Sequence, residues 1–275
     1  MHVERATARQ PATGEGTRDT SHCTITWLGH ATCLIDMAGV RLLTDPLLRD
    51  RLAFLQRWQA APDARDLRLD AVLVSHAHPD HLDPHSLDLI PRNVTVIAPA
   101  GADRIAAHHG RYVHTIERDA AVEIGNRVTV RSAPAVHDPR RHPLARRSIP
   151  GIERPEAVGF LVESNGFRVY FAGDTELYEG MAELASVDVA LLPVGGWWRA
   201  LGVGHMDGDQ AACAAALVEA HHAIPVHWGT FHPYFTRRIL ADTREEQPAR
   251  FVAALERLSP ATVAHVLQPG ESVQV

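Results

Sequence analysis

Six residues directly after an apolar run constrain the fold of this chain more than any other feature. Residues 76–81 read His-Ala-His-Pro-Asp-His, and they follow the apolar segment 69–75, which predicts a strand. A strand of that length carries its C-terminal end to one edge of a sheet, where open α/β sheets bind their ligands. In an extended segment His76 and His78 point the same way, and Pro79 favours a turn that brings the next two side chains beside them.

Imidazole and carboxylate groups are good ligands for zinc and related metals. The segment supplies four of them, His76, His78, Asp80 and His81, which is more than one tetrahedral ion can easily use. A single histidine beside a strand is more often structural or solvated, and a chain with 18 histidines will cluster some of them. Four costly polar groups at the end of one buried strand are a different case, and they predict a site for two metal ions.

The order of apolar segments predicts an α/β protein built from two sheets. Short strands form a meander, then mixed βα units, then a second meander with further βα units. This order favours a four-layer αββα sandwich, in which two mixed sheets pack face to face with helices outside. The pair Asn165-Gly166 predicts a hairpin turn, and Asp207 followed by Gln210 predicts a helix N-terminus. The expected strands are 24–28, 33–37, 40–43, 69–75, 95–98, 128–133, 157–162, 168–172, 187–193 and 224–227, and the expected helices are 84–90, 102–109, 178–185, 209–221 and 245–258.

The N-terminal segment differs in composition from the rest of the chain. Residues 1–21 are rich in Arg, Thr, Gly and Glu and contain no apolar core segment. They are expected to form a disordered leader and not a secretory signal. Residues 22–275 are expected to form a single domain.

Four further side chains with ligand chemistry stand just after apolar strands: Asp45, His137, Asp174 and His227. Taken singly, each has an ordinary explanation, since an aspartate before a proline is a common turn residue and Asp174 could cap the helix that follows it. Because all four fall at strand ends, as the first cluster does, they are expected to complete the same centre.

Read in order along the chain, these residues resemble the metallo-β-lactamase-fold hydrolases. Within that superfamily, four segments are similar to N-acyl-phosphatidylethanolamine-hydrolysing phospholipase D and to the ascorbate-6-phosphate lactonase branch. They are residues 27–32 (Trp-Leu-Gly-His-Ala-Thr), 43–46 (Leu-Thr-Asp-Pro), 173–175 (Gly-Asp-Thr) and 227–231 (His-Trp-Gly-Thr-Phe). The combination covers roughly Thr24 to Phe231 and is specific for fold and metal site. It is much less specific for the substrate.

The resemblance implies a ligand set. The first metal would be held by His76, His78 and His137, the second by Asp80, His81 and His227, with Asp174 bridging the two ions.

The resemblance also implies roles for residues around the ligands. Asp45 would support the ligands from behind, and His30 either does the same or is a hydrogen-bonded turn residue. His205 matches an active-site histidine of the phospholipase that is not a metal ligand, and could protonate a leaving group or stabilise an oxyanion. The expected catalytic residues are therefore Asp80, through the metal, and His205.

The chain departs from the phospholipase in three places. Asp138 stands where that enzyme has an aromatic residue, and the leader lacks the apolar elements of a membrane-docking enzyme. A Pro- and Arg-rich stretch at 137–156 predicts a long surface loop. Its guanidinium groups would bind a phosphate or carboxylate of the substrate unless they are simply solvated, and two tryptophans would wall the pocket unless they pack in the core. These candidate substrate-binding residues are Arg140, Arg141, Arg146, Arg147, Trp197 and Trp198.

Composition excludes several classes of function. The sequence has no lysine, so Schiff-base chemistry and a P-loop are excluded. A net charge of −6 gives no nucleic-acid footprint. No apolar run approaches the ~20 residues that span a bilayer, so no stable membrane association is expected. The three cysteines are widely spaced and are expected to be free thiols in a cytoplasmic protein.

We therefore expect an enzyme, a dinuclear-metal-dependent hydrolase whose metal-bridging hydroxide attacks a small phosphodiester-like or phosphorylated substrate. The alternatives are a lactonase or other acyl hydrolase on the same centre, and a metal-stabilised binding protein without catalysis. Zinc is the first expectation for both ions, with manganese or iron as alternatives. The expected partner is a small, anionic substrate and not a nucleic acid. The oligomeric state stays open.

Overall fold

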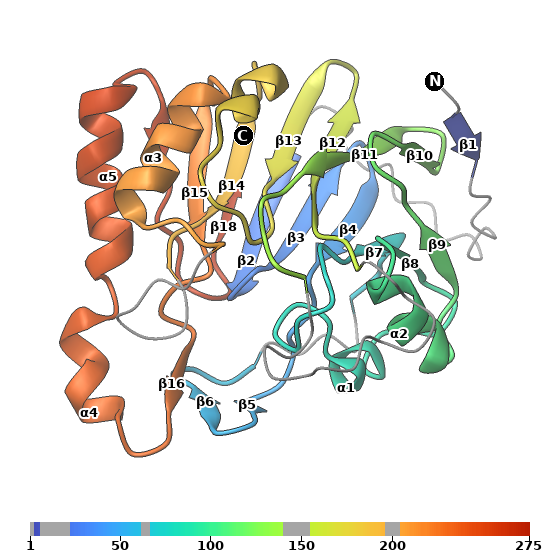
Figure 1. Cartoon of the computed structure of the whole chain (residues 1–275), viewed down its shortest axis with the longest axis horizontal. Helices are drawn as coiled ribbons and strands as arrows, with labels where there is room; N and C mark the ends of the chain where they lie inside the picture. Colours follow the sequence, from blue (N-terminus) through green and yellow to red (C-terminus); the bar gives the residue numbers. More distant parts are fainter. Residues whose placement is uncertain (1–2, 6–22, 62–66, 140–154, 196–203) are drawn as a thin grey trace.

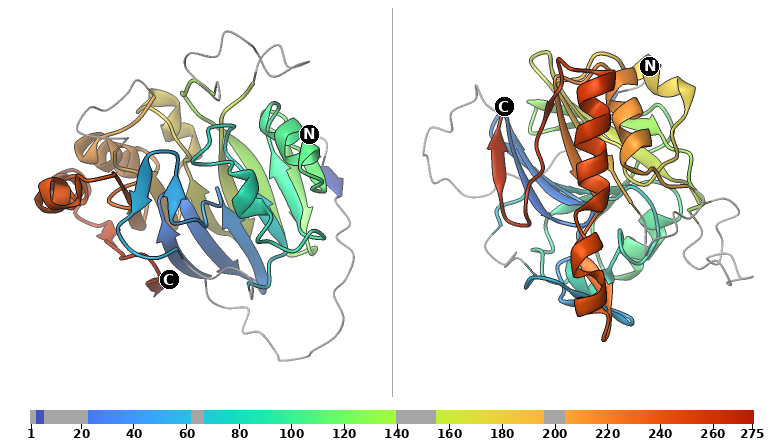
Figure 2. Two further views of the ribbon diagram at one scale, coloured as in Figure 1. Left: turned by 90° about the horizontal axis from the view of Figure 1, so that it is seen from below. Right: turned by 90° about the vertical axis from the view of Figure 1, so that its left-hand side faces the viewer.

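The computed structural model describes residues 3–5, 23–61, 67–139, 155–195 and 204–275. Two large mixed sheets form its centre, and helices lie on their outer faces (Figures 1 and 2). The predicted αββα sandwich is therefore confirmed. Apart from Val3–Arg5, which form strand β1, the expected leader lies outside the described residues, and its disorder stays a prediction.

The first large sheet has the strand order β18-β2-β3-β4-β7-β8-β9. It opens as an antiparallel meander and continues with parallel strands from β4 onward. Successive side chains alternate between its faces, so that Leu42 packs toward the second sheet while Leu43 packs toward the outer helices. The bounds are β2 Cys23–Gly29, β3 Thr32–Met37, β4 Val40–Thr44, β7 Ala71–Leu73, β8 Thr95–Ala98, β9 Val113–Thr115 and β18 Ser272–Gln274.

The second large sheet has the order β1-β10-β11-β12-β13-β14-β15-β17. Antiparallel hairpins join β10 to β13, and parallel strands follow from β13 to β17. Asn165 and Gly166 both have positive φ, as a type I′ turn requires, so the predicted hairpin is confirmed. The bounds are β10 Ala121–Ile124, β11 Val128–Pro134, β12 Val158–Ser164, β13 Phe167–Phe171, β14 Val189–Pro193, β15 His222–Val226 and β17 Val263–Ala264.

Helices cover the outer face of each large sheet. On the first sheet, α1 (Pro84–Leu87) and α2 (Ala102–His108) share an apolar cluster with the strands. On the second, α3 (Gly208–Leu217) packs on β14 and against α5 (Glu246–Leu258). Asp207 caps α3 in the predicted capping box with Gln210. The segment expected as a helix at 178–185 is instead the 3₁₀ helix η1 (Glu179–Leu184).

A third, smaller sheet projects from the body at the bottom of Figure 1. It contains β5 (Arg51–Leu52), β6 (Leu55–Arg57) and β16 (Phe231–Pro233), and the short elements α4 (Arg237–Leu240) and η2 (Ala241–Thr243) follow it in the chain. Strands of two or three residues are too short to display a period of two. The third sheet is therefore not predicted from the sequence.

Strand β7 is shorter than the sequence predicts. It runs from Ala71 to Leu73, whereas the expected strand is 69–75, so Ser75 already lies in the segment that leads to His76 and His78. The chain leaves the ladder because the backbone N–H of Ser75 donates to the Asp45 carboxylate, 2.7 Å away. The Ser75 carbonyl in turn accepts from Val158 N–H of the second sheet, 3.0 Å away.

Among the described residues, no helix combines the length and apolar character needed to cross a membrane.

The contact between α3 and α5 depends on a glycine, and this yields a stability prediction. A Cβ at Gly208 would stand 2.3 Å from the Gln247 carbonyl oxygen and 2.7 Å from the Phe251 nitrogen, both backbone atoms of α5. We expect Gly208→Ala to lower the free energy of unfolding by about 1–3 kcal/mol, since the two helices must separate. Chemical denaturation measures this. Ala253→Ser, on the exposed face of α5, is the control and should change stability little; equal stability of both variants would contradict the close packing.

Candidate metal centre

All seven ligands predicted from the sequence lie together at one edge of the sandwich. Together with His30 they form two adjoining groups of four, and within each group the ligand atoms lie within 4.8 Å of one another. The turn after β7 belongs to the first sheet, while the segments after β11, β13 and β15 belong to the second. The centre therefore lies between the two sheets, with both contributing. The groups are His76, His78, His137 and Asp174, and His30, Asp80, His81 and His227.

In the first group three imidazoles face one carboxylate. His137 Nε2 lies 3.1 Å from His78 Nδ1 and 4.0 Å from Asp174 Oδ2. His137 Nδ1 lies 2.8 Å from the carbonyl oxygen of Gly204, so Nδ1–H donates there and Nε2 is left for the centre. The ring is thus held in the orientation and tautomer that a metal ligand needs.

Asp174 connects the two groups. One of its oxygens, Oδ2, lies 3.1 Å from His81 Nε2, and the other, Oδ1, lies 3.3 Å from His227 Nε2. Asp80 Oδ2 faces the same two imidazoles at 3.3 and 3.6 Å. A carboxylate between the groups is where a bridging ligand would stand, which agrees with the position that the resemblance implies for Asp174.

His30 stands closer to the ligands than a turn residue would. Its Nε2 donates to Asp80 Oδ2 at 2.9 Å, which fits the predicted supporting role, although its ring is also part of the second group. The backbone there is fixed on both sides. The His30 N–H donates to Thr230 Oγ1, and its carbonyl accepts from His227 N–H and the Trp27 indole.

Asp45 and Ser75 orient the rings from outside the two groups. Asp45 is fully buried and accepts from the Ser75 hydroxyl at 2.6 Å and from His81 Nδ1 at 2.7 Å. Since the Ser75 hydroxyl donates to Asp45, it accepts from His76 Nδ1–H, 2.9 Å away. Both ring bonds turn Nε2 of His76 and His81 toward the centre. The sequence predicts the role of Asp45 but not that of Ser75, whose position directly before His76 was the available signal.

The protonation states suit metal binding. Burial is the main cause that lowers the pKa of His76 well below its usual value, that of His137 to about 4 and that of His30 to about 3. These rings are therefore neutral at physiological pH. A metal ligand must be neutral imidazole or ionised carboxylate, and these rings meet the requirement.

The carboxylates show the complementary effect. Burial alone raises the pKa of Asp174, but His227 and His81 outweigh it, so that its pKa lies well below the usual range. The pKa of Asp80 is lowered in the same way, with His81 as the main opposing cause. Burial lowers the pKa of His81, yet Asp174 and Asp80 raise it well above the usual value. The anionic cluster thus retains a proton at His81, where a cation would supply the same charge.

The hydrogen bonding of His76 Nε2 indicates whether a metal ion fits this site. His76 Nε2 is buried, is the unprotonated nitrogen of its ring, and has no hydrogen-bond partner among the described residues. A buried acceptor without a partner is costly. Together with the imidazole and carboxylate donors around it, this lone pair fits a divalent ion.

His205 lies at the margin of the centre. Its Nε2 is 3.2 Å from Asp174 Oδ2, and its side chain is 12% exposed. The preceding Gly204 has a φ of +91°, and a Cβ there would stand 2.5 Å from His137 Nδ1. Glycine at this position allows the loop to approach the ligands closely enough for His205 to reach them.

The predicted substrate-binding residues Arg140, Arg141, Arg146, Arg147, Trp197 and Trp198 lie outside the described residues. Their roles stay predictions. The three cysteines are free thiols, as expected, with Cys23 and Cys33 buried and Cys213 partly exposed.

Several known proteins are similar to this chain in sequence or in fold. Residues 40–228 match the family model of the beta-lactamase superfamily domain. A UPF0173 metal-dependent hydrolase of Methanopyrus kandleri is 32% identical, over 91% of this chain and 99% of that protein. An N-acyl-phosphatidylethanolamine-hydrolyzing phospholipase D of Caenorhabditis elegans is 30% identical, over 80% of this chain and 67% of that protein. The solved structure of Igni18, a metallo hydrolase of Ignicoccus hospitalis, has a TM-score of 0.71 at 20% identity, covering 93% of this chain and 99% of its own.

The hydrogen bonds of Asp45 predict its effect on metal affinity. We expect Asp45→Asn to weaken binding of divalent metal about 10–100-fold, because His81 and, through Ser75, His76 lose the acceptor that orients them. Competition with a chromophoric chelator measures the affinity. Asp83→Asn is the matched control, since Asp83 is also buried but caps α1 through Ser86. That variant should lose stability while keeping metal affinity, and an equal loss of affinity in both would contradict the role of Asp45.

Proposed function

The chain belongs to the metallo-β-lactamase superfamily, among the UPF0173 metal-dependent hydrolases, and from that premise we propose that it cleaves a small phosphodiester-like or phosphorylated substrate with two divalent ions. The observation that carries the proposal is the pair of adjoining ligand groups joined through Asp174. One tetrahedral ion would leave about half of these buried ligands unused.

We assign the ligands by the two groups. His76, His78 and His137 would hold one ion, Asp80, His81 and His227 the other, and Asp174 both. Two ions held by these residues would supply a water that is ionised near neutral pH and would polarise the oxygen of the scissile group. The nitrogen and oxygen ligands favour zinc, with manganese or iron as alternatives.

The protein side chains supply the remaining functions. Asp45 and Ser75 keep one imidazole of each group, His76 and His81, in one tautomer and orientation. His205 is surplus as a ligand, is partly exposed, and lies against Asp174. It is therefore placed to protonate a leaving group or to donate to a developing oxyanion.

A phosphodiester is favoured over an acyl substrate by the Caenorhabditis elegans relative, which is named as a phospholipase D. The free thiols favour a reducing compartment, and we propose a cytoplasmic location.

Metal content tests the two-ion proposal. We expect about two transition-metal ions per chain, zinc first, in protein purified without chelator. Elemental analysis measures this. A reproducible content of one or none after metal addition would contradict it. The chelated protein should remain folded by circular dichroism, since the two-sheet core does not depend on the ions.

Replacement of His205 tests its role. We expect His205→Ala to keep both ions and its melting temperature while kcat on bis(p-nitrophenyl) phosphate falls at least tenfold, since loss of one donor to a developing oxyanion typically costs roughly 10²–10³ in rate. His227→Ala is the comparison and should lose one ion along with activity. Loss of metal in the His205 variant would make that residue a ligand, and an unchanged kcat would make it merely structural.

A further inference from the structure

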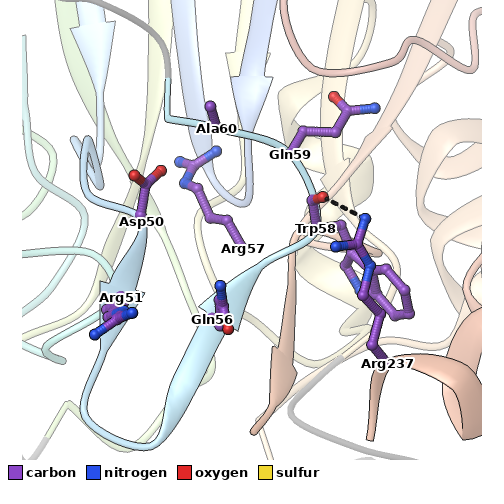
Figure 3. Close-up of a pocket in the computed structure, with 8 residues that line it drawn as sticks. All are labelled: Asp50, Arg51, Gln56, Arg57, Trp58, Gln59, Ala60 and Arg237. Atoms are coloured by element: carbon purple, nitrogen blue, oxygen red, sulfur yellow. Dashed lines mark hydrogen bonds between the residues drawn. The ribbon is translucent and has the colours of Figure 1, made fainter. Parts of the chain in front are cut away.

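The small third sheet carries a pocket outside the metal centre (Figure 3). Its volume is about 250 Å³, and β5, β6, the segment after β6 and α4 contribute to its wall. The wall is strongly polar, with arginine, glutamine and aspartate side chains around one indole ring. The residues that carry the argument are Asp50, Arg51, Arg57, Trp58 and Arg237.

The pocket and the metal centre share structural neighbours. Arg57 donates to the Leu28 carbonyl at 3.2 Å, two residues before His30. Trp58 N–H donates to the carbonyl of Thr230, the same residue whose hydroxyl accepts from His30 N–H. A single ring, Phe231, separates the Arg57 guanidinium, 5.1 Å from its centroid, from the His30 ring, 5.9 Å from it.

The pocket wall has one carboxylate, Asp50, and three guanidinium groups, so its net charge is positive. Arg57 is buried and donates to three carbonyl oxygens, of Arg49, Leu28 and Leu47. Asp50 accepts from Ala61 N–H and lies close enough to Arg57 to raise the pKa of that guanidinium, although burial, the larger cause, lowers it to about 10. The one carboxylate is thus matched by the buried arginine.

Two exposed arginines remain at the rim. Arg51 lies over the Tyr234 ring, 5.5 Å from its centroid. Arg237 lies 5.7 Å from the Trp58 centroid, with a bond from one terminal nitrogen to the Trp58 carbonyl at 3.3 Å. Neither cation has a carboxylate partner among the described residues, in a chain whose net charge is −6. Such a pair of guanidinium groups suits a phosphate or carboxylate.

Two exposed aromatic rings stand next to these arginines. Phe54 is 67% exposed and Phe235 is 97% exposed. They are neighbours, because Tyr234 N–H donates to the Phe54 carbonyl at 3.1 Å. Single exposed apolar residues are common, but two at adjoining loop tips near exposed arginines form an amphipathic surface. A symmetric dimer through this surface would bring the arginines of both copies together, which disfavours a second copy as the occupant.

We propose that this pocket binds the anionic group, phosphate or carboxylate, of a small amphiphilic substrate whose apolar part lies over Phe54 and Phe235. The inference rests on the proposed hydrolase function and adds a substrate class to it. Arg51 and Arg237 bind the anion from opposite sides of the pocket, and the Trp58 ring forms the wall beside Arg237 (Figure 3).

Binding to the metal-loaded protein tests the anion site. The probes are octyl phosphate and octanoate, each below its critical micelle concentration, and inorganic phosphate, all measured by calorimetry. We expect the double variant Arg51→Gln/Arg237→Gln to bind the preferred octyl probe at least tenfold more weakly with unchanged metal content, since two charge-assisted hydrogen bonds are lost. The exposed Arg118→Gln is the control and should bind as the original protein does. The octyl probe that binds more tightly identifies the preferred anion.

Equal affinity of the original protein and the double arginine variant for both octyl probes would overturn the proposal, because the probes would then be held at the metals.

The apolar part has its own test. We expect Phe54→Ser/Phe235→Ser to weaken the octyl probe at least fivefold while leaving inorganic phosphate unchanged. Tyr112→Ser removes an aromatic ring of similar exposure, 69%, near β9 and should have no effect. Light scattering completes the test, because a dimer that Phe235→Ser abolishes would assign this surface to a second copy and overturn the proposal.

The outcomes separate this proposal from the hydrolase function. Arginine-dependent binding without hydrolysis of any phosphoester or ester would refute only the proposed function. Hydrolysis with unchanged probe binding in the arginine variant would refute only the pocket.

Discussion

Asp45, Asp80 and Asp174 are all buried among imidazoles at the edge where the two sheets meet. Removing a carboxylate from water costs several kcal/mol unless charge and hydrogen bonds compensate for it. Here the three carboxylates are compensated by two different sets of groups. Asp45 receives hydrogen bonds from Ser75 and His81, whereas Asp80 and Asp174 face the rings of the centre. The raised pKa of His81 shows that these anions favour positive charge among them. A cation bound at this place would therefore stabilise the fold as well as serve the proposed chemistry.

The same compensation determines the local backbone. Strand β7 has only three residues, because the Ser75 N–H donates to the Asp45 carboxylate and not to a neighbouring strand. The segment after Ser75 thereby enters the turn that carries the candidate ligands. His30, Asp45 and His227 all have positive φ, a conformation that costs free energy for residues other than glycine. Strain at three such positions in one centre indicates a backbone held in place by its surroundings, as functional sites commonly are.

The sequence predicts the ligands better than it predicts the elements around them. The candidate ligands from His76 to His227 can be predicted because each has a side chain suited to metal binding and also follows an apolar strand. The length of β7 cannot be predicted, because Asp45, whose carboxylate takes the Ser75 amide out of the ladder, lies thirty positions earlier in the chain. Ser75 was overlooked for the same reason, since its role becomes visible only once Asp45 and His76 are seen on either side of its hydroxyl. The third sheet was missed because β6 pairs with β16, whose three residues are far away in the chain and give no periodic pattern.

Sandwich sheets usually meet through side chains, but here backbone hydrogen bonds also join them, from Val158 N–H to the Ser75 carbonyl and from His227 N–H to the His30 carbonyl. Gly173 makes room for the bond to Ser75, because a Cβ there would stand 2.8 Å from that of Ser75 and 3.2 Å from the Val158 carbonyl oxygen. The sheets are thus joined by main-chain hydrogen bonds beside the candidate ligands. We therefore expect the sandwich to open least at this edge, where candidate ligands from both sheets must keep their spacing. The two sheets would then move relative to each other about the edge that carries the candidate metal centre.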